Sequence, residues 1–367
     1  MSIISLYEKS DKLFFVGGVV RDEILGKTSP DIDLTYVGNA IEFANTLNFG
    51  EILQVNEEFG SVHLKIEDKT IDITSTRIEE YPEKGQLPVV TKIGCSLQDD
   101  VKRRDFTVNA IAKNCKTGEI VDFVDGRKDL NEKKLRILHK NSFIDDPTRI
   151  IRGLKFAVRF EFELEEQTKK YQEEYLKNVD YNMSFKRLKD ELIDAFNLDR
   201  QIVYDKFVNE KMYKLLSESE DFSENLCNIE EFIKPYKNEI SNTWLIYLAG
   251  FNLKNLPLTK NEIKILEGYK NLLDKDFTSD FDIYKNFSNM PIESIIIYGV
   301  YNNLELVKKY LNELRRINIL ITGKDLIELG YKPSKSIAKA LEAVLRVKLK
   351  FPDIDKTKEL EIARENM

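Results

Sequence analysis

The spacing of apolar residues changes near residue 145, and this change limits the folds that the chain can adopt. Before it, short β-rich runs are separated by turns: KLFFV (12–16), IDLTYV (32–37), VHLKI (62–66) and TIDIT (70–74), with a hairpin turn expected at EDKT (67–70). After it, apolar residues recur with helical spacing over residues 147–160, 165–178, 184–196, 261–274 and 303–315. The pattern predicts a small α/β head followed by an all-helical remainder.

The length and composition predict a soluble chain of several units. A chain of 367 residues is too long for one ordinary core, and we expect two to four units. No apolar run approaches the ~20 residues that span a bilayer. The three cysteines form no CxxC pair, which fits a reducing, cytoplasmic location. With only two histidines, His63 and His139, we do not expect a His-rich metal site.

The charge distribution leaves nucleic acid binding open. A net charge of −7 argues against it when taken alone. Residues 101–160, however, carry 15 Lys and Arg against 8 Asp and Glu, and residues 319–350 carry 7 against 3. These segments are either basic binding surfaces or ordinary solvated helix faces.

The segment GGVVRDEILGKTSPDIDLT (17–35) predicts a phosphate site. A strand is expected to end at Gly17 and Gly18, and a helix to begin near Val19. Paired glycines let backbone N–H groups approach a phosphate, and a helix N-terminus favours anions. Arg21, within the first turn, is placed to meet an oxyanion.

Two aspartates, Asp31 and Asp33, follow on a predicted strand and predict a catalytic metal site. Residues two apart on a strand project to one face, where their charges repel unless a cation lies between them. Asp72, in TIDIT, is expected on an adjacent strand. Three such carboxylates suit two Mg²⁺ ions that activate an attacking hydroxyl and stabilise a pyrophosphate leaving group.

The segment KRRDFTVNAIA (102–112) contains further nucleotide-binding candidates. Arg104 suits a phosphate, whereas Asp105 and Asn109 suit ribose hydroxyls. The run FTVNAIA is expected to be a buried strand or the start of a helix. The alternative is a helix cap with exposed basic residues.

The segment FIDDPTRIIRGLKFAVRF (143–160) predicts a helix with Asp146 as N-cap and Pro147 in the first helical position. Arg149, Arg152 and Lys155 then recur every three residues near one face. They form either a basic stripe that binds the nucleotide or the polar side of an amphipathic helix.

The pair Asp146 and Arg149 suggests a way of choosing a base. Adenine and cytosine share an edge with a ring nitrogen acceptor beside an amino donor. An Arg donor beside an Asp acceptor matches both, whereas guanine and uracil present the reverse pattern and leave charges unpaired. The alternative is that Asp146 only caps the helix.

Taken together, GGVVRD (17–22), DID (31–33), RRDFTVNA (103–110) and DDPTRIIRGLKF (145–156) resemble class II tRNA nucleotidyltransferases, the family of CCA-adding enzymes and bacterial poly(A) polymerases. MSFKRLKDEL (183–192) and ITGKDLIELGYKPSKSIAKAL (321–341) are similar to later segments of that family.

The resemblance implies a domain order. A polymerase-β-like head (1–140) is followed by a helical neck (141–200), body (201–310) and tail (311–367). In the head and neck, Asp31 and Asp33 bind metal, Gly18, Arg21 and Arg104 hold the nucleotide, and Asp146 and Arg149 read its base. The body and tail grip the acceptor and T arm of tRNA through its backbone, with the tail residues Lys324, Lys332, Ser334 and Lys335 as candidate contacts.

The resemblance also implies a reaction. The first expectation is addition of CCA to tRNA from CTP and ATP; the alternatives are an A-adding enzyme that needs a separate CC-adding partner, or a poly(A) polymerase. The loop RIEEYPEKGQLPVVTKIGCS (77–96) looks closer to a branch that contains A-adding enzymes, and its presence argues against a C-only enzyme. Two rivals of other classes are a catalytically inactive RNA-binding module and a nucleotidyltransferase that modifies a protein or a small molecule.

Overall fold

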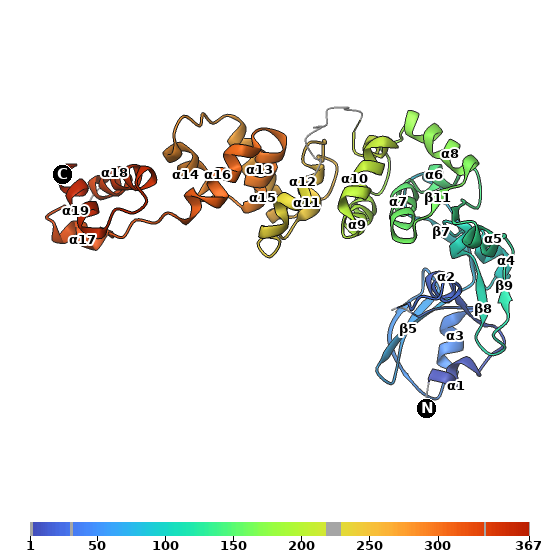
Figure 1. Cartoon of the computed structure of the whole chain (residues 1–367). Coiled ribbons are helices and arrows are strands. Elements are labelled where there is room, and N and C mark those ends of the chain that lie inside the picture. The colour runs from blue at the N-terminus through green and yellow to red at the C-terminus, as the bar shows by residue number, and fades with distance from the viewer. Residues whose placement is uncertain (1–2, 30–31, 218–228, 334, 367) are drawn as a thin grey trace. The chain divides into compact units, whose positions relative to one another are not determined.

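The computed structural model describes residues 3–29, 32–217, 229–333 and 335–366. The chain divides into two compact units. The first comprises residues 1–218 and 255–257, and the second comprises residues 219–254 and 258–367. Figure 1 shows the strands in the first unit, whereas the described part of the second unit forms helices joined by loops. The head-then-helices architecture expected from the sequence is confirmed.

A seven-stranded mixed sheet with the order β3-β4-β5-β2-β1-β8-β9 forms the centre of the first unit. β2 and β5 run parallel, and every other neighbouring pair is antiparallel. The strands are β1 (Leu13–Val16), β2 (Asp33–Tyr36), β3 (Glu51–Asn56), β4 (Ser61–Ile66), β5 (Lys69–Ser75), β8 (Ala112–Asn114) and β9 (Ile120–Val121). The four predicted strands are therefore β1, β2, β4 and β5. The turn between β4 and β5 is formed by residues 67–68, within the predicted range 67–70, whose last two residues belong to β5.

One face of this sheet holds a hydrophobic core. The core is shared with α1 (Ile3–Tyr7) and α3 (Ala40–Asn45), and its buried residues are Leu6, Leu13, Leu34, Ala40, Phe43, Ala44, Val62, Leu64, Ile66, Ile71 and Ile73. Because side chains alternate along a strand, the residues between these apolar positions lie on the opposite face. That opposite face carries the polar residues of β2, β4 and β5.

Shorter elements lie outside this sheet, including two separate two-stranded sheets. β6 (Arg77–Glu80) and β7 (Val89–Ile93) form an antiparallel ribbon, and β10 (Lys134–Leu135) pairs in parallel with β11 (Glu163–Leu164). Three short helices are α4 (Leu97–Val101), the 3₁₀ turn η1 (Thr107–Asn109) and α5 (Gly126–Asn131). The run FTVNAIA is buried as expected, but it contains a 3₁₀ turn followed by the first residue of β8.

The remaining helices of the first unit are α2 (Gly18–Ile24), α6 (Ser142–Asp145), α7 (Thr148–Phe160), α8 (Glu166–Lys177), α9 (Phe185–Phe196), α10 (Arg200–Asn209) and the 3₁₀ turn η2 (Met212–Leu215). α7, α8 and α9 agree with the predicted helices to within one residue at each end. Ile150, Ile151 and Leu154 of α7 are buried, as the apolar spacing of that helix predicts.

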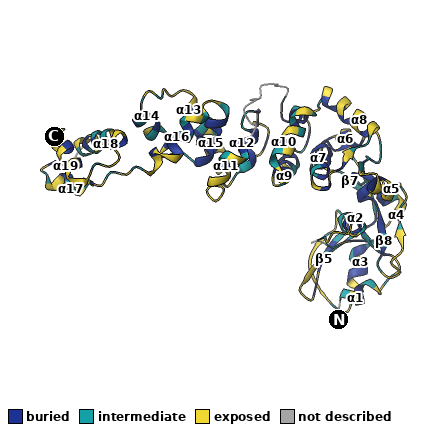
Figure 2. Ribbon diagram, viewed as in Figure 1, coloured by how far each residue is buried: buried dark blue, intermediate teal, exposed yellow. Residues whose placement is uncertain are grey.

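The described elements of the second unit are α11 (Ile229–Ile233), η4 (Lys234–Tyr236), α12 (Thr243–Leu248), α13 (Lys260–Leu273), α14 (Asp280–Phe287), α15 (Ile292–Tyr301), α16 (Leu304–Asn312), η5 (Leu314–Arg316), α17 (Gly323–Glu328), α18 (Lys335–Lys350) and α19 (Lys356–Glu365). The local sequence explains where α13 begins, since Thr259 and Glu262 form a capping box. Figure 2 shows buried and exposed residues on the same helices, as expected of amphipathic segments. No helix within the described ranges is long and apolar enough to cross a membrane. The division into head, neck, body and tail stays a prediction.

Candidate active site

The glycine pair after β1 forms the first wall of the site. β1 ends at Val16, Gly17 adopts a φ of 69°, and α2 begins at Gly18, as expected. Glycine adopts this positive φ without the strain that a Cβ would bring. A Cβ on Gly17 would lie 3.5 Å from Nη1 of Arg104, so the turn holds backbone close to a cation.

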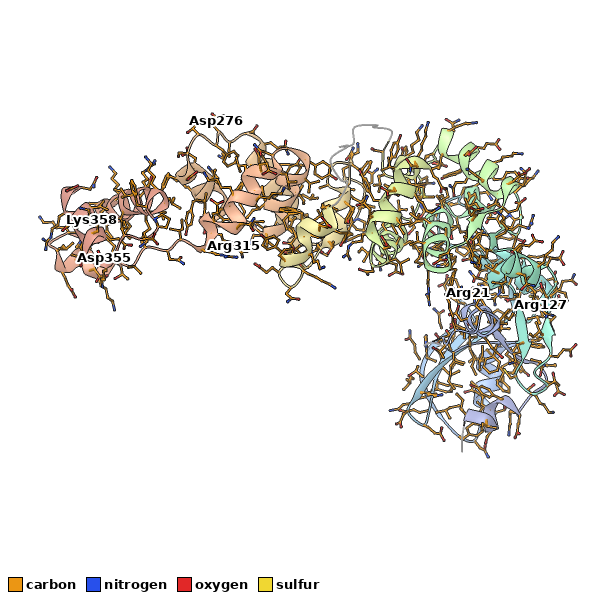
Figure 3. The ribbon with its side chains drawn as sticks, viewed as in Figure 1. Arg21, Arg127, Asp276, Arg315, Asp355 and Lys358 are labelled. Atoms are coloured by element: carbon orange, nitrogen blue, oxygen red, sulfur yellow. The ribbon has the colours of Figure 1, made fainter. Side chains whose placement is uncertain are left out.

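Arg21, on α2, is a buried cation (Figure 3). Its Nη1 donates to Asn109 Oδ1 at 2.6 Å, and its Nε donates to Asp22 Oδ1 at 2.8 Å. Its guanidinium carbon also lies 4.3 Å from the centre of the Phe160 ring. Burial lowers the pKa of Arg21, and the neighbouring Asp22 opposes that shift. Arg21 thus fixes Asn109 in addition to contributing positive charge.

Two of the three predicted carboxylates, Asp33 and Asp72, are neighbours across β2 and β5. Asp33 is the first residue of β2, and its direct neighbour across the parallel pair is Asp72 of β5. Residues opposite one another in adjacent strands project to the same face, so these two side chains are neighbours. Asp31 lies outside the described residues. Within those that are described, no group of three His, Cys, Asp or Glu side chains is arranged to hold a metal ion.

The segment before η1 combines charges with internal hydrogen bonds. Arg104 Nη2 donates to Asp100 Oδ2 at 3.1 Å. Asp105 Oδ1 accepts from Asn109 Nδ2 at 3.0 Å and from the backbone N–H of Phe106 at 2.8 Å. Burial would raise the pKa of Asp105, but the charge of Arg152 and these hydrogen bonds lower it to about 2. Asp105 is therefore an anion that orders its surroundings.

The start of α7 differs from the prediction by one residue. The helix begins at Thr148, with Pro147 before it. The reason is that the first turn has the hydrogen bonds of a 3₁₀ helix, which span three residues. Arg149 N–H donates to the Asp146 carbonyl, and Ile150 N–H donates to the Pro147 carbonyl. Asp146 nevertheless acts as a cap, because its Oδ1 accepts from Thr148 N–H at 3.2 Å and from the Thr148 hydroxyl at 2.6 Å.

Asp146 and Arg149 are both buried and lie side by side. Arg149 Nε is 3.8 Å from Asp146 Oδ2. Two hydrogen bonds fix the guanidinium of Arg149: Nη1 donates to Ser142 Oγ at 2.6 Å, and Nη2 donates to the Arg103 carbonyl at 2.9 Å. One carboxylate oxygen of Asp146 caps the helix, so the cap and the other contacts of Asp146 use different oxygens.

Arg152 and Lys155 form a network with Glu191 of α9. Arg152 donates to Asp105 Oδ2 through Nε and Nη2, at 3.0 and 2.8 Å, and to Glu191 Oε1 through Nη1 at 2.7 Å. Lys155 donates to Glu191 Oε2 at 2.6 Å. Burial would lower the pKa of Arg152, but Asp105 and Glu191 raise it. The network joins α7, α9 and the segment before η1.

These elements enclose a cleft of about 560 Å³. All ten predicted nucleotide-binding residues line it, together with Asp33: Gly17, Gly18, Arg21, Arg104, Asp105, Asn109, Asp146, Arg149, Arg152 and Lys155. Nine Arg and Lys side chains line the cleft, against four Asp and Glu side chains. Such an excess suits a polyanionic ligand such as a triphosphate.

Sequence reasoning missed several residues of the cleft. Arg187 of α9 donates to Asp146 Oδ2 at 2.6 Å, and the Tyr81 hydroxyl accepts from Arg149 Nη2 at 3.3 Å. Arg187 and Glu191 lie in MSFKRLKDEL, whose resemblance was the available signal. Tyr81 lies in the loop between β6 and β7, where no residue type predicted a role for it.

The predicted RNA contacts lie in the second unit. Lys324 is on α17, Lys332 is in the turn that follows, and Lys335 begins α18. All three side chains are exposed. Ser334 lies outside the described residues. The role of these residues in RNA binding stays a prediction.

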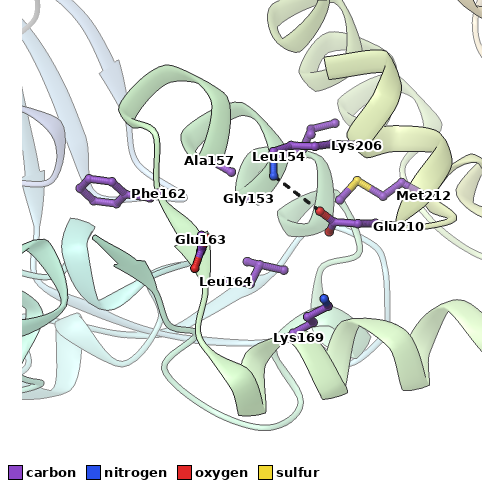
Figure 4. Close-up of a pocket in the computed structure, with 10 residues that line it drawn as sticks. All are labelled: Gly153, Leu154, Ala157, Phe162, Glu163, Leu164, Lys169, Lys206, Glu210 and Met212. Carbon is purple, nitrogen blue, oxygen red and sulfur yellow. Dashed lines mark ion pairs between the residues drawn. The ribbon is translucent and has the colours of Figure 1, made fainter. Parts of the chain in front are cut away.

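A second cavity of about 260 Å³ lies along α7 but contains none of the predicted site residues (Figure 4). Gly153, Leu154 and Ala157 line it, on the side of the helix opposite to Arg152 and Lys155. Lys206 and Glu210 also line this cavity. Their charged groups lie 3.9 Å apart, and the two residues are four positions apart at the C-terminal end of α10. The chemistry-bearing residues of α7 therefore face the larger cleft.

Comparison with known proteins identifies similar chains. The model of the poly(A) polymerase head domain matches residues 13–136. An A-adding tRNA nucleotidyltransferase of Halalkalibacterium halodurans is 30% identical, over 96% of this chain and 88% of its own. An A-adding tRNA nucleotidyltransferase of Aquifex aeolicus is 43% identical, over 43% of this chain and 20% of its own. A CCA-adding enzyme of Enterococcus faecalis is 25% identical, over 86% of this chain and 82% of its own.

Solved structures have the same fold over the whole chain. The apo form II of a CCA-adding enzyme superimposes with a TM-score of 0.82 at 25% identity, covering 100% of this chain and 96% of that one. A complex of a CCA-adding enzyme with ATP gives a TM-score of 0.78 at 25% identity, covering 99% and 93%.

Proposed function

Because the chain belongs to the class II tRNA nucleotidyltransferase family, we propose that it transfers AMP from ATP to the 3′ end of a tRNA that already ends in CC. From the sequence alone, full CCA addition is the first expectation and addition of a single A is the alternative. The main support for A addition is the similarity to A-adding relatives, one of which matches 96% of the chain at 30% identity. In this function a separate enzyme supplies the CC end.

The cleft supports binding of a nucleoside triphosphate. The backbone at Gly17 and Gly18 and the N-terminus of α2 are placed to take phosphate oxygens. Arg104, Arg149 and Arg152 contribute charge from two other segments. Each of these arginines is held by carboxylates or carbonyls, so the positive charge is already oriented before the substrate arrives.

Asp146 and Arg149 remain the candidates for reading the base. Arg149 is anchored by Ser142 and the Arg103 carbonyl, which leaves its guanidinium little freedom to adapt to a wrong base. Arg187 is a third group at the same place, because it donates to Asp146 Oδ2. An adenine amino group that binds Asp146 Oδ2 would either share this oxygen with Arg187 or displace Arg187 from it.

The residues present suit Mg²⁺. Asp33 and Asp72 offer carboxylate oxygens, the ligands that Mg²⁺ prefers, on neighbouring strands and on one face. When bound by these residues and Asp31, Mg²⁺ supplies positive charge for ionising the 3′ hydroxyl and for the departure of pyrophosphate. The chain itself orients the triphosphate through the cationic cleft and the acceptor end through its RNA contacts, for which Lys324, Lys332 and Lys335 are candidates.

Full CCA addition is the second candidate. It is favoured by the structural match, because a CCA-adding enzyme superimposes on the whole chain with a TM-score of 0.82. The same cleft residues would then accept CTP before ATP.

The deciding experiment offers the purified protein, with Mg²⁺, three tRNA transcripts that end before CCA, after one C, and after CC. Each transcript receives CTP, ATP or both, and the products are resolved to one nucleotide. One A added only to the CC-ending transcript supports A addition. Addition of C, C and A followed by arrest would replace it with CCA addition, and no extension of any transcript would contradict both.

A further inference from the structure

A row of polar side chains crosses the sheet beyond the two candidate metal ligands. Asp33 of β2 lies opposite Asp72 of β5, Asp72 lies opposite His63 of β4, and His63 lies opposite Gln54 of β3. Directly opposed residues of adjacent strands share a face. The register therefore continues the carboxylate pair into a histidine.

This row lies on the face away from the hydrophobic core. On β4, Val62 and Leu64 flank His63 and are buried in that core, and on β5, Ile71 and Ile73 do the same for Asp72. The side chain of His63 is 36% exposed and that of Asp72 is 45% exposed. His63 is therefore not a core residue, and packing gives no reason for a histidine at this position.

His63 contacts Asp72 directly, through Nδ1 and Oδ1. A carboxylate oxygen accepts hydrogen bonds, so this contact is favourable when Nδ1 is the imidazole nitrogen that carries a proton. A half-exposed aspartate otherwise rotates among several rotamers, which weakens its contribution to any metal site. The contact with His63 restricts this rotation and occupies only Oδ1.

We infer that His63 is a positioning residue, which holds the Asp72 carboxylate beside Asp33 for a divalent cation. The inference rests on the proposed function, because it assumes that Asp33 and Asp72 bind the metal. His63 acts through Asp72 and has no role in contacting substrate. Side chains that orient a metal ligand in this way are worth about 10–100-fold in metal affinity.

Three variants test this role. His63→Val removes the donor and keeps a β-branched residue that suits a strand. His63→Asn keeps a donor, because the amide nitrogen of asparagine can occupy the place of Nδ1. Gln54→Val is the matched control, since it changes the next residue of the same row, on the neighbouring and more exposed strand β3.

The primary measurement is binding of Mn²⁺ alone, by electron paramagnetic resonance, without nucleotide or tRNA; kcat and KM for ATP are measured beside it. We expect His63→Val to weaken Mn²⁺ binding at least 10-fold and to lower kcat more than it raises KM. His63→Asn should recover most of the Mn²⁺ affinity and most of kcat. Gln54→Val should match the wild type in both. Wild-type Mn²⁺ affinity in His63→Val, or no recovery in His63→Asn, would overturn the inference.

Asp33→Ala separates this inference from the proposed function. If Asp33→Ala abolishes Mn²⁺ binding and His63→Val does not change it, the positioning role is wrong and the metal site stands. If Asp33→Ala binds Mn²⁺ as the wild type does, the metal site itself is wrong, and the inference fails with it.

Discussion

Arg152 donates two hydrogen bonds to a single oxygen of Asp105, from Nε at 3.0 Å and from Nη2 at 2.8 Å. The two residues lie 47 positions apart, on α7 and just before η1. This contact fixes the helix that carries Arg149 and Lys155 to the segment that carries Arg104 and Asn109. The geometry of the cleft thus depends on a pair in which both charges are largely withdrawn from water.

The ionised state of Asp105 predicts a pH dependence of stability. Its pKa is lowered from 3.8 to about 2 in the folded protein, so its contribution is complete above the unfolded pKa and is lost as the pH falls toward 2. That contribution is about 2 kcal/mol at neutral pH. Relative to Asp105→Asn, the wild type should lose about 1 kcal/mol of this advantage between pH 7 and pH 3, measured by urea unfolding. An advantage that is equal at both values would contradict the shifted pKa.

The anchored position of Arg149 predicts an effect on base choice. Arg149→Ala should reduce discrimination of ATP against GTP by about tenfold or more, because a buried donor is lost from the pair that we propose reads the base. Binding of the triphosphate should weaken less, since eight other cations line the cleft. The measurement is single-nucleotide addition to a CC-ending tRNA with each of the four triphosphates.

Arg159→Ala is the matched control for that variant. Arg159 also lines the cleft, but it forms an ion pair with Asp22, at 3.8 Å, instead of Asp146. It should weaken ATP binding and leave base choice unchanged. Equal selectivity in Arg149→Ala and the wild type would remove Arg149 from the base-reading role.

The close packing of the loop between β6 and β7 predicts that Gly85→Ala, which adds one methyl group, disturbs the loop. Gly85 N–H donates to the Asp145 carbonyl, and its own carbonyl accepts from Ser184 N–H, so the loop is tied next to Asp146. Its φ is 78°, and a Cβ would lie 2.6 Å from the Asn182 carbonyl oxygen. Gly85→Ala should therefore detach the loop, lower the rate of A addition at saturating ATP, and expose residues 81–88 to limited proteolysis.

Gly118→Ala is the control for backbone strain. Gly118 has a similar φ of 73°, but a Cβ there meets only Lys113 Cε, at 3.9 Å. Both substitutions carry the strain of a left-handed alanine, about 1–2 kcal/mol. Gly118→Ala should lose stability yet keep the wild-type rate of transfer; the same loss of rate in both variants would show that strain alone is responsible.

A buried ion pair in the second unit predicts a large stability effect. Lys348 Nζ lies 3.0 Å from Glu359 Oε1, with side chains that are 8% and 0% exposed. Glu359 Oε2 also accepts from the backbone N–H groups of Leu320 and Ile321, at 2.6 and 3.0 Å. Glu359→Ala leaves both backbone donors unpaired and the buried Lys348 charge without its counter-ion, although Lys348 Nζ keeps its bond to the Ile354 carbonyl. The variant should destabilise the unit by about 3–5 kcal/mol in chemical denaturation.

The exposed pair of Lys358 and Glu361 provides the comparison on the same helix. These side chains lie 2.8 Å apart, and each is more than half exposed. Glu361→Ala should change stability very little, because water screens such a pair. Similar losses in both variants would show that burial of Glu359 does not govern its contribution.

By itself, the sequence determined the local elements and the chemistry that they carry. Apolar spacing located β1, β2, β4, β5, α7, α8 and α9, because periods of two and 3.6 residues are properties of the backbone. It missed β3, whose residues are mostly exposed, and the β6–β7 ribbon, where the apolar signal is weak. Residue type and order were sufficient to nominate Asp33, Asp105, Asp146 and Arg149, since each stands in a segment with its own signal.

Only the tertiary structure decided which partners those residues have. The register of β2 against β5 and of β5 against β4 places His63 next to Asp72, and neither strand encodes its partner locally. Glu191 and Arg187 reach Arg152 and Asp146 only because α9 packs on α7. Contacts between distant segments depend on how whole apolar faces fit together, and that fit is a property of the folded chain and not of any one motif.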